Sequence, residues 1–418
     1  MKRISIAALL AFGTIANAQD AVPVVTPGGT KVSLYGRLEL NSSYEDGLTS
    51  NLWSSNAVSN ANKEAQGRTT LSIARTRLGL NLEGPSKEGE PDLKGRFEAD
   101  FAGQSSYNNH NGSSGFRVRQ SFGSVNFKNF GTTLLFGMTD DLVTPIDPPS
   151  INPSSLNGAG NIGSRRPQIR VTQALGPAEL AVAATHDRLR ANESVASSSP
   201  AIQGRLGVKL PATWAGEKAN MAAGVSGLFA KDEAANDSND ARKPRGPNSN
   251  LIGADLSIPL MSILTLTGEW FIGQNLTRYG DGSLGLNHTD TLNPKKVQKD
   301  GISSMGFWAA LSAKLPANFS AATGIGMENI DGDVKFITDA DGNVKVDSEN
   351  STKRAGSREG NMFTFVNVGY NFTSAAKLTF EYLNLATDYA DKVDKGKKVG
   401  VDSGSLNRYE LNFRYDFK

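Results

Sequence analysis

Short segments in which every second residue is apolar recur along almost the whole chain. Residues 32–41 set Val32, Leu34, Leu38 and Leu40 against Ser33, Arg37, Glu39 and Asn41. Residues 74–82 set Ala74, Leu78, Leu80 and Leu82 against Arg75, Arg77 and Asn81, and residues 93–101, 252–258 and 408–417 repeat the pattern. Successive side chains of a β-strand point to opposite faces, so this period predicts strands with one apolar and one polar face. A soluble sandwich and a membrane barrel can both be built from such strands.

The connections between these segments favour the barrel, because short and long ones alternate. Four-residue connections such as 128–131 and 315–318 lie between long polar loops, at about 45–68, 103–115, 140–167, 186–200, 231–248, 274–301, 329–360 and 387–405. The pattern gives about sixteen strands, seven short turns and eight long loops, as is typical of an outer-membrane barrel. Closure satisfies every backbone group in lipid, and sixteen strands enclose a water-filled lumen. We therefore predict an all-β protein, a transmembrane antiparallel β-barrel with short periplasmic turns and long extracellular loops.

The N-terminus has the pattern of a secretory signal. Lys2 and Arg3 precede the apolar residues 4–15, and Ala16-Asn17-Ala18 forms a small-x-small cleavage site. The apolar run is shorter than the roughly 20 residues that a membrane-spanning helix needs. We expect residues 1–18 to be a signal peptide and residues 19–418 to form the barrel domain.

Composition argues against several classes of function. The chain has no cysteine and only three histidines, at positions 110, 186 and 288, so catalytic triads and metal sites have few residues to use. A net charge of +2 over 418 residues does not suit a dedicated nucleic-acid binder. We predict no enzymatic activity, no cofactor and no metal.

Two motifs suggest ligands but lack the required context. Gly158-x-Gly160-x-x-Gly163 matches a dinucleotide fingerprint, yet it follows prolines rather than a strand and opens no helix. Asp339-x-Asp341-x-Asn343 is similar to a calcium loop, but Gly342 stands at the fourth position rather than the sixth. A β-hairpin turning at Asp341-Gly342 explains this second motif better.

Positive charge concentrates on the polar face of the first four predicted strands. Its seven basic residues are Arg37, Arg75, Arg77, Lys94, Arg96, Arg117 and Arg119. Only Glu39, Glu98 and Asp100 oppose them, a local excess of four positive charges in a nearly neutral chain. The pattern indicates an arginine-rich lumen wall that sets ion selectivity, although a solvated basic face would look the same.

Several of these features together resemble the Gram-negative trimeric porins: the signal sequence, residues 32–40 (Val-Ser-Leu-Tyr-Gly-Arg-Leu-Glu-Leu), Arg75-x-Arg77-x-Gly79, the long loop after the fifth strand and the aromatic-alternating last strand. Residues 116–119, 135–138 and 165–170 are similar to the DcaP-like branch. The resemblance implies a homotrimer in which the loop 140–167 bends into the barrel and narrows the pore. It also places further charged residues at this constriction, namely Asp140, Asp141, Asp147, Arg165, Arg166 and Arg170.

The expected function is passive diffusion of small hydrophilic solutes and ions across the outer membrane, with a preference for anions or carboxylates. A structural barrel or an adhesin acting through its long loops is the alternative. A barrel enzyme would need a nucleophile–base pair, which we do not find. Conductance in a planar bilayer separates a channel from an adhesin.

Overall fold

The computed structural model describes residues 23–47, 58, 67–103, 115–143, 145–186, 199–214, 217–231, 248–279, 302–332, 334–347, 356–401 and 403–418. The expected signal peptide, residues 1–18, lies outside this part of the chain. No helix among the described residues is long and apolar enough to cross a membrane.

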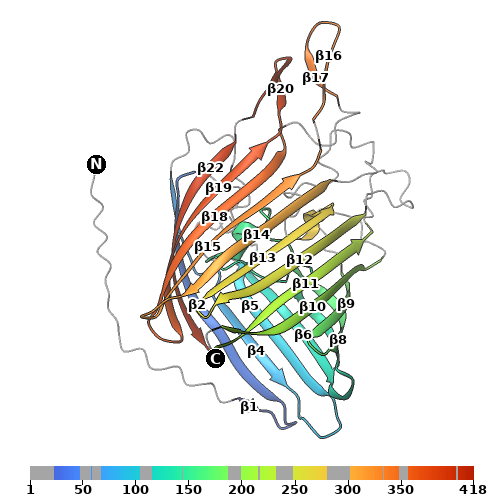
Figure 1. Ribbon diagram of the computed structural model, residues 1–418, viewed down its shortest axis with the longest axis vertical. Helices are drawn as coiled ribbons and strands as arrows, with labels where there is room; N and C mark the ends of the chain where they lie inside the picture. Colours follow the sequence, from blue (N-terminus) through green and yellow to red (C-terminus); the bar gives the residue numbers. More distant parts are fainter. Residues whose placement is uncertain are drawn as a thin grey trace.

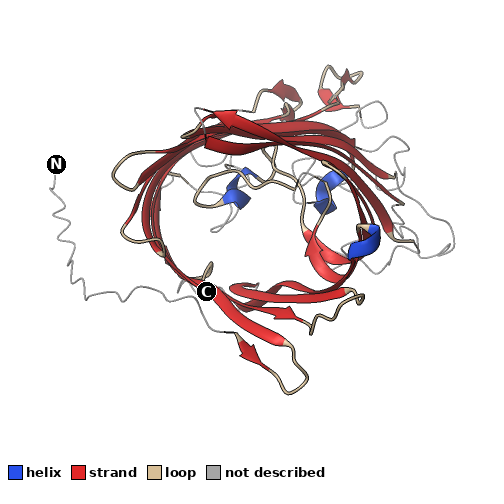
Figure 2. Cartoon of the chain, turned by 60° about the horizontal axis from the view of Figure 1, so that its bottom comes forward, coloured by secondary structure: helices blue, strands red, loops and turns tan. Residues whose placement is uncertain are grey.

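Sixteen antiparallel wall strands form a closed barrel (Figures 1 and 2). They are β2 (Lys31–Glu45), β3 (Arg68–Ser72) with β4 (Arg77–Glu83) as one wall strand, β5 (Asp92–Gly103), β6 (Gly115–Phe127), β7 (Thr132–Asp140), β8 (Arg165–Leu175), β9 (Ala178–Thr185), β10 (Ala201–Trp214), β11 (Glu217–Ala230), β12 (Ser249–Met261), β13 (Leu264–Gln274), β14 (Ser303–Lys314), β15 (Phe319–Ile330), β18 (Arg358–Asn371), β19 (Ala376–Tyr389) and β22 (Gly404–Phe417). The first and last wall strands pair from Gly36 with Phe417 to Glu45 with Arg408, which closes the ring. The predicted strand number and closure are thus confirmed.

The two ends of the barrel differ. Short turns join the strands at one end, whereas β16 (Phe336–Thr338) with β17 (Val344–Val346), and β20 (Lys392–Asp394) with β21 (Lys397–Val399), form hairpins that project beyond the other end (Figure 1). The remaining elements are short: β1 (Val24–Val25), which pairs with β2, and the 3-10 helices η1 (Lys128–Phe130), η2 (Pro153–Leu156) and η3 (Leu276–Tyr279).

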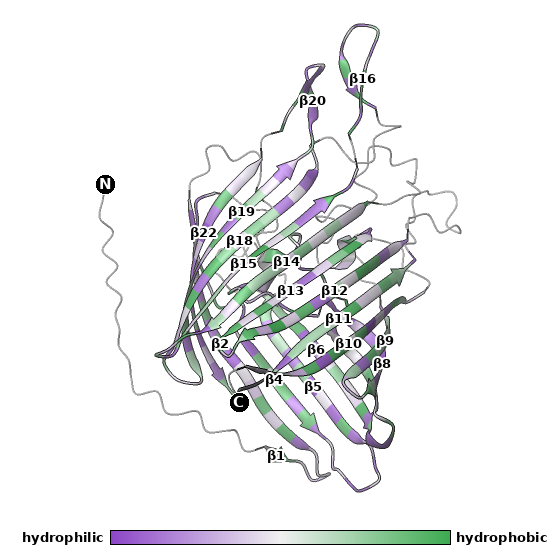
Figure 3. Ribbon diagram, in the orientation of Figure 1, coloured by the Kyte–Doolittle hydropathy of each residue, from purple (hydrophilic) through white to green (hydrophobic). Residues whose placement is uncertain are grey.

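The outer surface of the wall is apolar. Hydrophobic and hydrophilic residues alternate along the strands (Figure 3), and the outward side chains of Leu38, Ile252 and Leu411 are 53%, 64% and 47% exposed. The intervening Glu39 and Glu410 are buried on the inward side. An apolar belt on a closed barrel suits hydrocarbon rather than water, so the fold is a transmembrane barrel.

One predicted face is wrong, at the join between β3 and β4. Ile73 is exposed on the outside while Ala74 is buried, so Ala74 does not share the lipid face with Leu78. The Thr76 N–H donates to the Ile73 carbonyl at 2.9 Å, and the Phe101 N–H donates to the Ala74 carbonyl at 3.0 Å. This tight turn within one wall strand shifts the alternation, which a strict period of two could not anticipate.

Residues 141–143 and 145–164, which we call the inner loop, lie inside the ring of strands (Figure 2). β8 already begins at Arg165, which pairs with Asp140, so residues 165–167 belong to the wall rather than to the expected loop 140–167. The inner loop packs on apolar inward side chains: Leu156 and Ala159 lie in a cluster with Trp308 and Phe363. A second cluster joins Val143 and Ile162 to wall residues including Leu228 and Phe271. The hydrophobic core therefore lies between the inner loop and one half of the wall.

Candidate functional site

Three buried carboxylates on β2 and β5 are each shared by two arginines. On β2, Glu39 contacts Arg37 Nε at 3.0 Å through Oε2 and Arg75 Nη2 at 2.5 Å through Oε1. These contacts bind the turn that follows β3 to the first wall strand.

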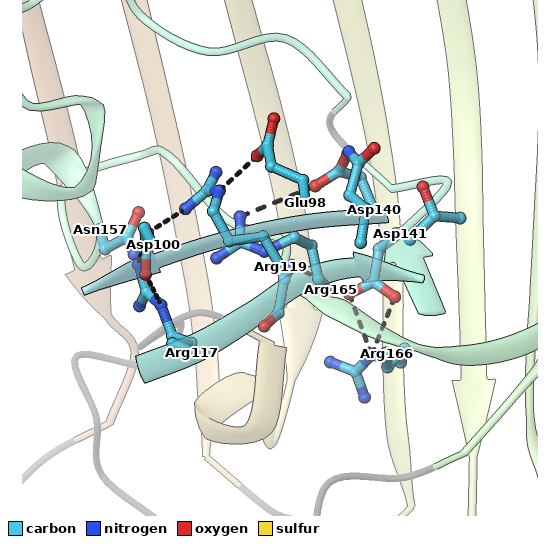
Figure 4. A network of polar contacts seen from close by, with 12 residues as sticks. Glu98, Asp100, Arg117, Arg119, Asp140, Asp141, Asn157, Arg165 and Arg166 are labelled. Carbon is cyan, nitrogen blue, oxygen red and sulfur yellow. Dashed lines mark hydrogen bonds and ion pairs between the residues drawn. The ribbon is translucent and has the colours of Figure 1, made fainter. Parts of the chain in front are cut away.

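The other two shared carboxylates belong to β5 (Figure 4). Glu98 Oε1 lies 3.5 Å from Arg77 Nη1 and 2.7 Å from Arg119 Nε. Asp100 accepts two parallel hydrogen bonds from Arg117, at 2.9 and 2.6 Å, and contacts Arg119 Nη1 at 3.1 Å. The arginine cluster, defined as Arg37, Arg75, Arg77, Arg117 and Arg119, thus holds two more positive charges than its three carboxylates neutralise.

Strand register brings this cluster together. Arg77 lies directly across from Asp100, and Asp100 lies across from Arg117. The register shifts at Glu98, so that Arg119 is an extra residue in β6. Its guanidinium therefore reaches both Glu98 and Asp100.

Asp140, Arg165 and Arg170 lie at the end of β7 and on β8. Arg165 Nη1 is 3.7 Å from Asp140 Oδ1, and Gln120 Nε2 donates to Asp140 Oδ2 at 2.9 Å. Arg170 donates to the Asp140 carbonyl at 2.5 Å and to Gln168 at 3.0 Å. The Asp140 side chain remains 57% exposed, so its charge is presented to solvent.

Asp141 and Arg166 form a buried pair at the base of the inner loop (Figure 4). Their atoms Oδ1 and Nε are 2.8 Å apart. Asp141 also accepts from the Ser164 N–H at 3.0 Å and from Gln203 Nε2 at 2.8 Å. The Arg166 guanidinium lies 4.3 Å from the centre of the Tyr279 ring. Neither charged group faces open solvent, so this pair anchors the inner loop.

Lys94 and Arg96 lie on the polar face of β5 toward the short-turn end, and both are exposed. Arg96 Nε donates to Asn81 Oδ1 at 3.0 Å, and its guanidinium lies 5.3 Å from the centre of the Tyr35 ring. They extend the positive surface away from the arginine cluster.

The three loop acids that we expected together are separated in the structure. Asp140 adjoins β8 and Asp141 is buried. Asp147 is exposed on the inner loop, and its electrostatic neighbours include Glu269 on β13. β13 lies halfway round the ring from β5, so Asp147 is near the wall opposite the arginine cluster.

Two acids that sequence reasoning missed fix the inner loop to that opposite wall. Glu269 accepts from the Ile146 N–H at 2.6 Å and from Trp308 Nε1 at 2.8 Å. Glu381 accepts from the Ile151 N–H at 2.9 Å. The sequence feature that could have identified them is a single acid within an apolar stretch. Glu269 lies in Gly-Glu-Trp-Phe, and Glu381 lies in Phe-Glu-Tyr-Leu.

The glycine motif of the inner loop has a structural role. Gly158, Gly160 and Gly163 all have positive φ angles, of 78°, 95° and 112°. A Cβ on Gly160 would lie 1.9 Å from the carbonyl oxygen of Phe307. The motif therefore allows close contact with β14, in a context unlike a dinucleotide site.

The motif that is similar to a calcium loop forms a hairpin, as predicted. β16 and β17 pair antiparallel around Gly342, whose φ is 81°. Lys345 Nζ lies 2.8 Å from the Asp339 carboxylate, which also accepts from the Asn343 N–H. These hydrogen bonds hold the pKa of Asp339 below its usual value. Among the described residues, no three His, Cys, Asp or Glu side chains are grouped to hold a metal ion.

The similarity of this chain to known proteins lies in its fold. No protein-family model matches it, and no curated protein matches its sequence. The outer-membrane channel DcaP of Acinetobacter baumannii superposes with a TM-score of 0.70 and 18% identity, covering 95% of this chain and 100% of that one.

Two other solved barrels are similar to a lesser degree. The anion-selective porin from Comamonas acidovorans has a TM-score of 0.57 and 14% identity, covering 93% of this chain and 100% of that one. OmpF of Salmonella typhi, in complex with daunomycin, has a TM-score of 0.54 and 10% identity, and the match covers 94% of this chain and 99% of that one. At these identities the likeness concerns architecture. The chain thus has the fold of the outer-membrane porins, including that of the DcaP-like branch.

Proposed function

We propose that this protein is an outer-membrane porin, exported by residues 1–18 and assembled as a homotrimer. It forms a water-filled channel through which small hydrophilic solutes and ions diffuse passively, with a preference for anions or carboxylates. The porin fold and the apolar belt support the outer-membrane location. The proposed anion preference rests on one observation: two arginines of the cluster share each of the carboxylates Glu39, Glu98 and Asp100.

The physical basis of this preference is the excess of positive charge in the arginine cluster. Arginine stays charged at all relevant pH values, and its planar fork matches carboxylate or phosphate oxygens. The similar fold of a porin described as anion-selective also supports the proposal. Exposed Asp140 and Asp147 oppose the excess, so the selectivity should be modest. It should also fade with salt, because the Debye length falls from about 30 Å at 0.01 M to about 3 Å at 1 M.

The inner loop is the proposed constriction. Its contacts with Glu269 and Glu381 hold it across the lumen, facing the strands of the arginine cluster. Solutes would then pass between the inner loop and that cluster.

The test is the reversal potential of the purified protein in a planar bilayer under a salt gradient. We expect anion selectivity at low salt. Arg77→Gln should shift the reversal potential toward cations, and Glu98→Gln should shift it toward anions, because each changes the excess by one charge. Glu98 keeps Arg119 as a partner in the first variant, so the barrel should still assemble.

Cation selectivity of the unmutated pore at low salt would contradict the anion preference while leaving the channel intact. Absence of any conductance would favour the structural or adhesive alternative. Simultaneous replacement of Arg77, Arg117 and Arg119 is a poorer test, since it leaves Glu98 and Asp100 without the cations that they contact.

A further inference from the structure

A recess of about 590 Å³ lies between the inner loop and the wall, toward the short-turn end. Pro149 of the inner loop borders it on one side, and residues of β11 to β15, β18 and β19 line the rest. The lining contains two lysines and no carboxylate. Its main polar groups are Lys314, Lys377, Ser257, Ser312, Ser320 and Asn220.

The two lysines are placed around one serine. Lys314 and Ser320 are direct partners across β14 and β15, and Ser320 is in turn the partner of Gly369 on β18. A Cβ on Gly369 would lie 2.3 Å from Lys377 Cε and 2.8 Å from Ser320 Oγ. The Lys377 side chain therefore lies over Gly369 and ends beside the serine hydroxyl.

Both ammonium groups are available to a ligand. Within the described part of the chain, neither lysine has a carboxylate within the 4.0 Å of an ion pair. All five arginines of the arginine cluster, by contrast, already contact a shared carboxylate. Asp416 acts on Lys377 from a longer distance and is itself paired with Arg414 at 2.7 Å. Cations without an ion-pair contact in a polar recess attract an anionic group, while the serine hydroxyls can donate to and accept from hydroxyl groups.

We propose that this recess is a binding site for small hydroxylated organic anions, meaning a carboxylate or phosphate carried on a polyol. The ammonium groups bind the anionic end, and the serine hydroxyls and the Asn220 carboxamide bind the hydroxyls. The volume is that of a small-molecule site. This inference rests on the proposed channel and extends it, because a solute leaving the constriction would pause here on its way to the periplasm.

The recess and the arginine cluster belong to different parts of the ring. The cluster lies on β2 to β6 and the recess on β11 to β19, with β22 between β19 and β2. Arg414 on β22 is a charged neighbour of both Arg37 and Lys377. Lys314 on β14 lies farther round the ring from the cluster than Lys377 does.

The experiment measures block of single-channel current by gluconate, added to each side of a planar bilayer in turn. Hexanoate has the same charge and carbon number without the hydroxyls, and glucose 6-phosphate replaces the carboxylate by a phosphate. We expect gluconate to block at lower concentration than hexanoate. The double variant Lys314→Gln/Lys377→Gln should raise the half-blocking concentration of gluconate about tenfold, as for loss of a charge-assisted hydrogen bond.

Lys209→Gln is the matched control, because Lys209 is an exposed lysine near the short-turn end of β10 that does not line the recess. It should change the half-blocking concentration by less than about twofold. Equal block by gluconate and hexanoate, or an equal effect of Lys209→Gln, would overturn the inference. An open pore without gluconate block refutes the inference alone, whereas absence of current refutes the proposed channel. In that case calorimetric titration of the detergent-solubilised protein with gluconate and hexanoate still decides whether the recess binds.

Discussion

Single buried carboxylates fix the position of the inner loop. Glu381 accepts hydrogen bonds from Ser150 Oγ at 2.8 Å, from the Ile151 N–H at 2.9 Å and from Asn367 Nδ2 at 2.9 Å. All three partners are donors, so this position requires a group that only accepts. The wall residue thereby determines where the middle of the loop lies.

Glu381→Gln should loosen that attachment. A glutamine NH₂ would face a donor, and one unsatisfied buried group costs about 1–3 kcal/mol. We expect more current fluctuation in single-channel recordings, with the barrel still heat-resistant on gels. Glu90→Gln, which neutralises a carboxylate in an exposed turn, should leave the recordings unchanged. If the current through Glu381→Gln fluctuated no more than that of the unmutated protein, the other contacts of the inner loop would be enough to hold it in place.

Among the elements of the fold, the inner loop packs closely against the inward face of the strands on one side of the wall. Gly160 contacts the backbone of β14 so closely that no side chain fits, and its φ is 95°. Asn361 Nδ2 on β18 donates to the Gly158 carbonyl at 2.9 Å. The loop and the wall are therefore complementary in backbone as well as side chain.

Gly160→Val should displace the inner loop without breaking the barrel. The added carbon meets backbone that cannot move aside, so we expect an altered conductance and faster proteolysis of the loop. Gly89→Val is a control for backbone strain alone, since Gly89 has a φ of 83° and open space around it. If the two variants behaved alike, the close contact with Phe307 would be unimportant.

The strands could be predicted because their signal is local. Alternation and the contrast between short and long connections can be read within about ten residues, and they gave the number of strands and their closure. The docking of the inner loop depends on partners far along the chain: Ile146 and Glu269 are 123 residues apart, and Ile151 and Glu381 are 230 apart. Composition cannot reveal such pairs. The same limit applies to Asp141, whose buried pairing with Arg166 depends on how the loop returns to β8.

In the whole molecule, the outer face of the barrel wall suits lipid, whereas the inner face suits water and polar groups. Tyr409 and Leu411 are exposed on the outer face of β22, while Arg408 and Glu410 are buried on the inner one. Phe413 continues the outer series, and its ring centre lies 6.5 Å from that of Phe372.

Phe413→Arg should therefore impair assembly in the membrane. A charge turned toward hydrocarbon costs roughly 2–4 kcal/mol at the midplane and less near the interface. The measurement is the fraction of heat-resistant barrel in isolated membranes, with Phe413→Tyr as the control that keeps an aromatic ring. Normal assembly of Phe413→Arg together with failure of Arg414→Phe would reverse the inside–outside assignment of this strand.

The seam between β2 and β22 has a consequence for biogenesis. Contacts across it join residues such as Glu39 and Asn412, which are 373 positions apart in the chain. Until the final 14-residue strand is in place, β2 and β19 both present unpaired edges, which lipid cannot satisfy. Without β22 the ring of strands stays open, and both of its edges would face hydrocarbon. Ring closure and compatibility with the membrane are thus acquired in one step, because the strand that completes the ring also removes both unpaired edges.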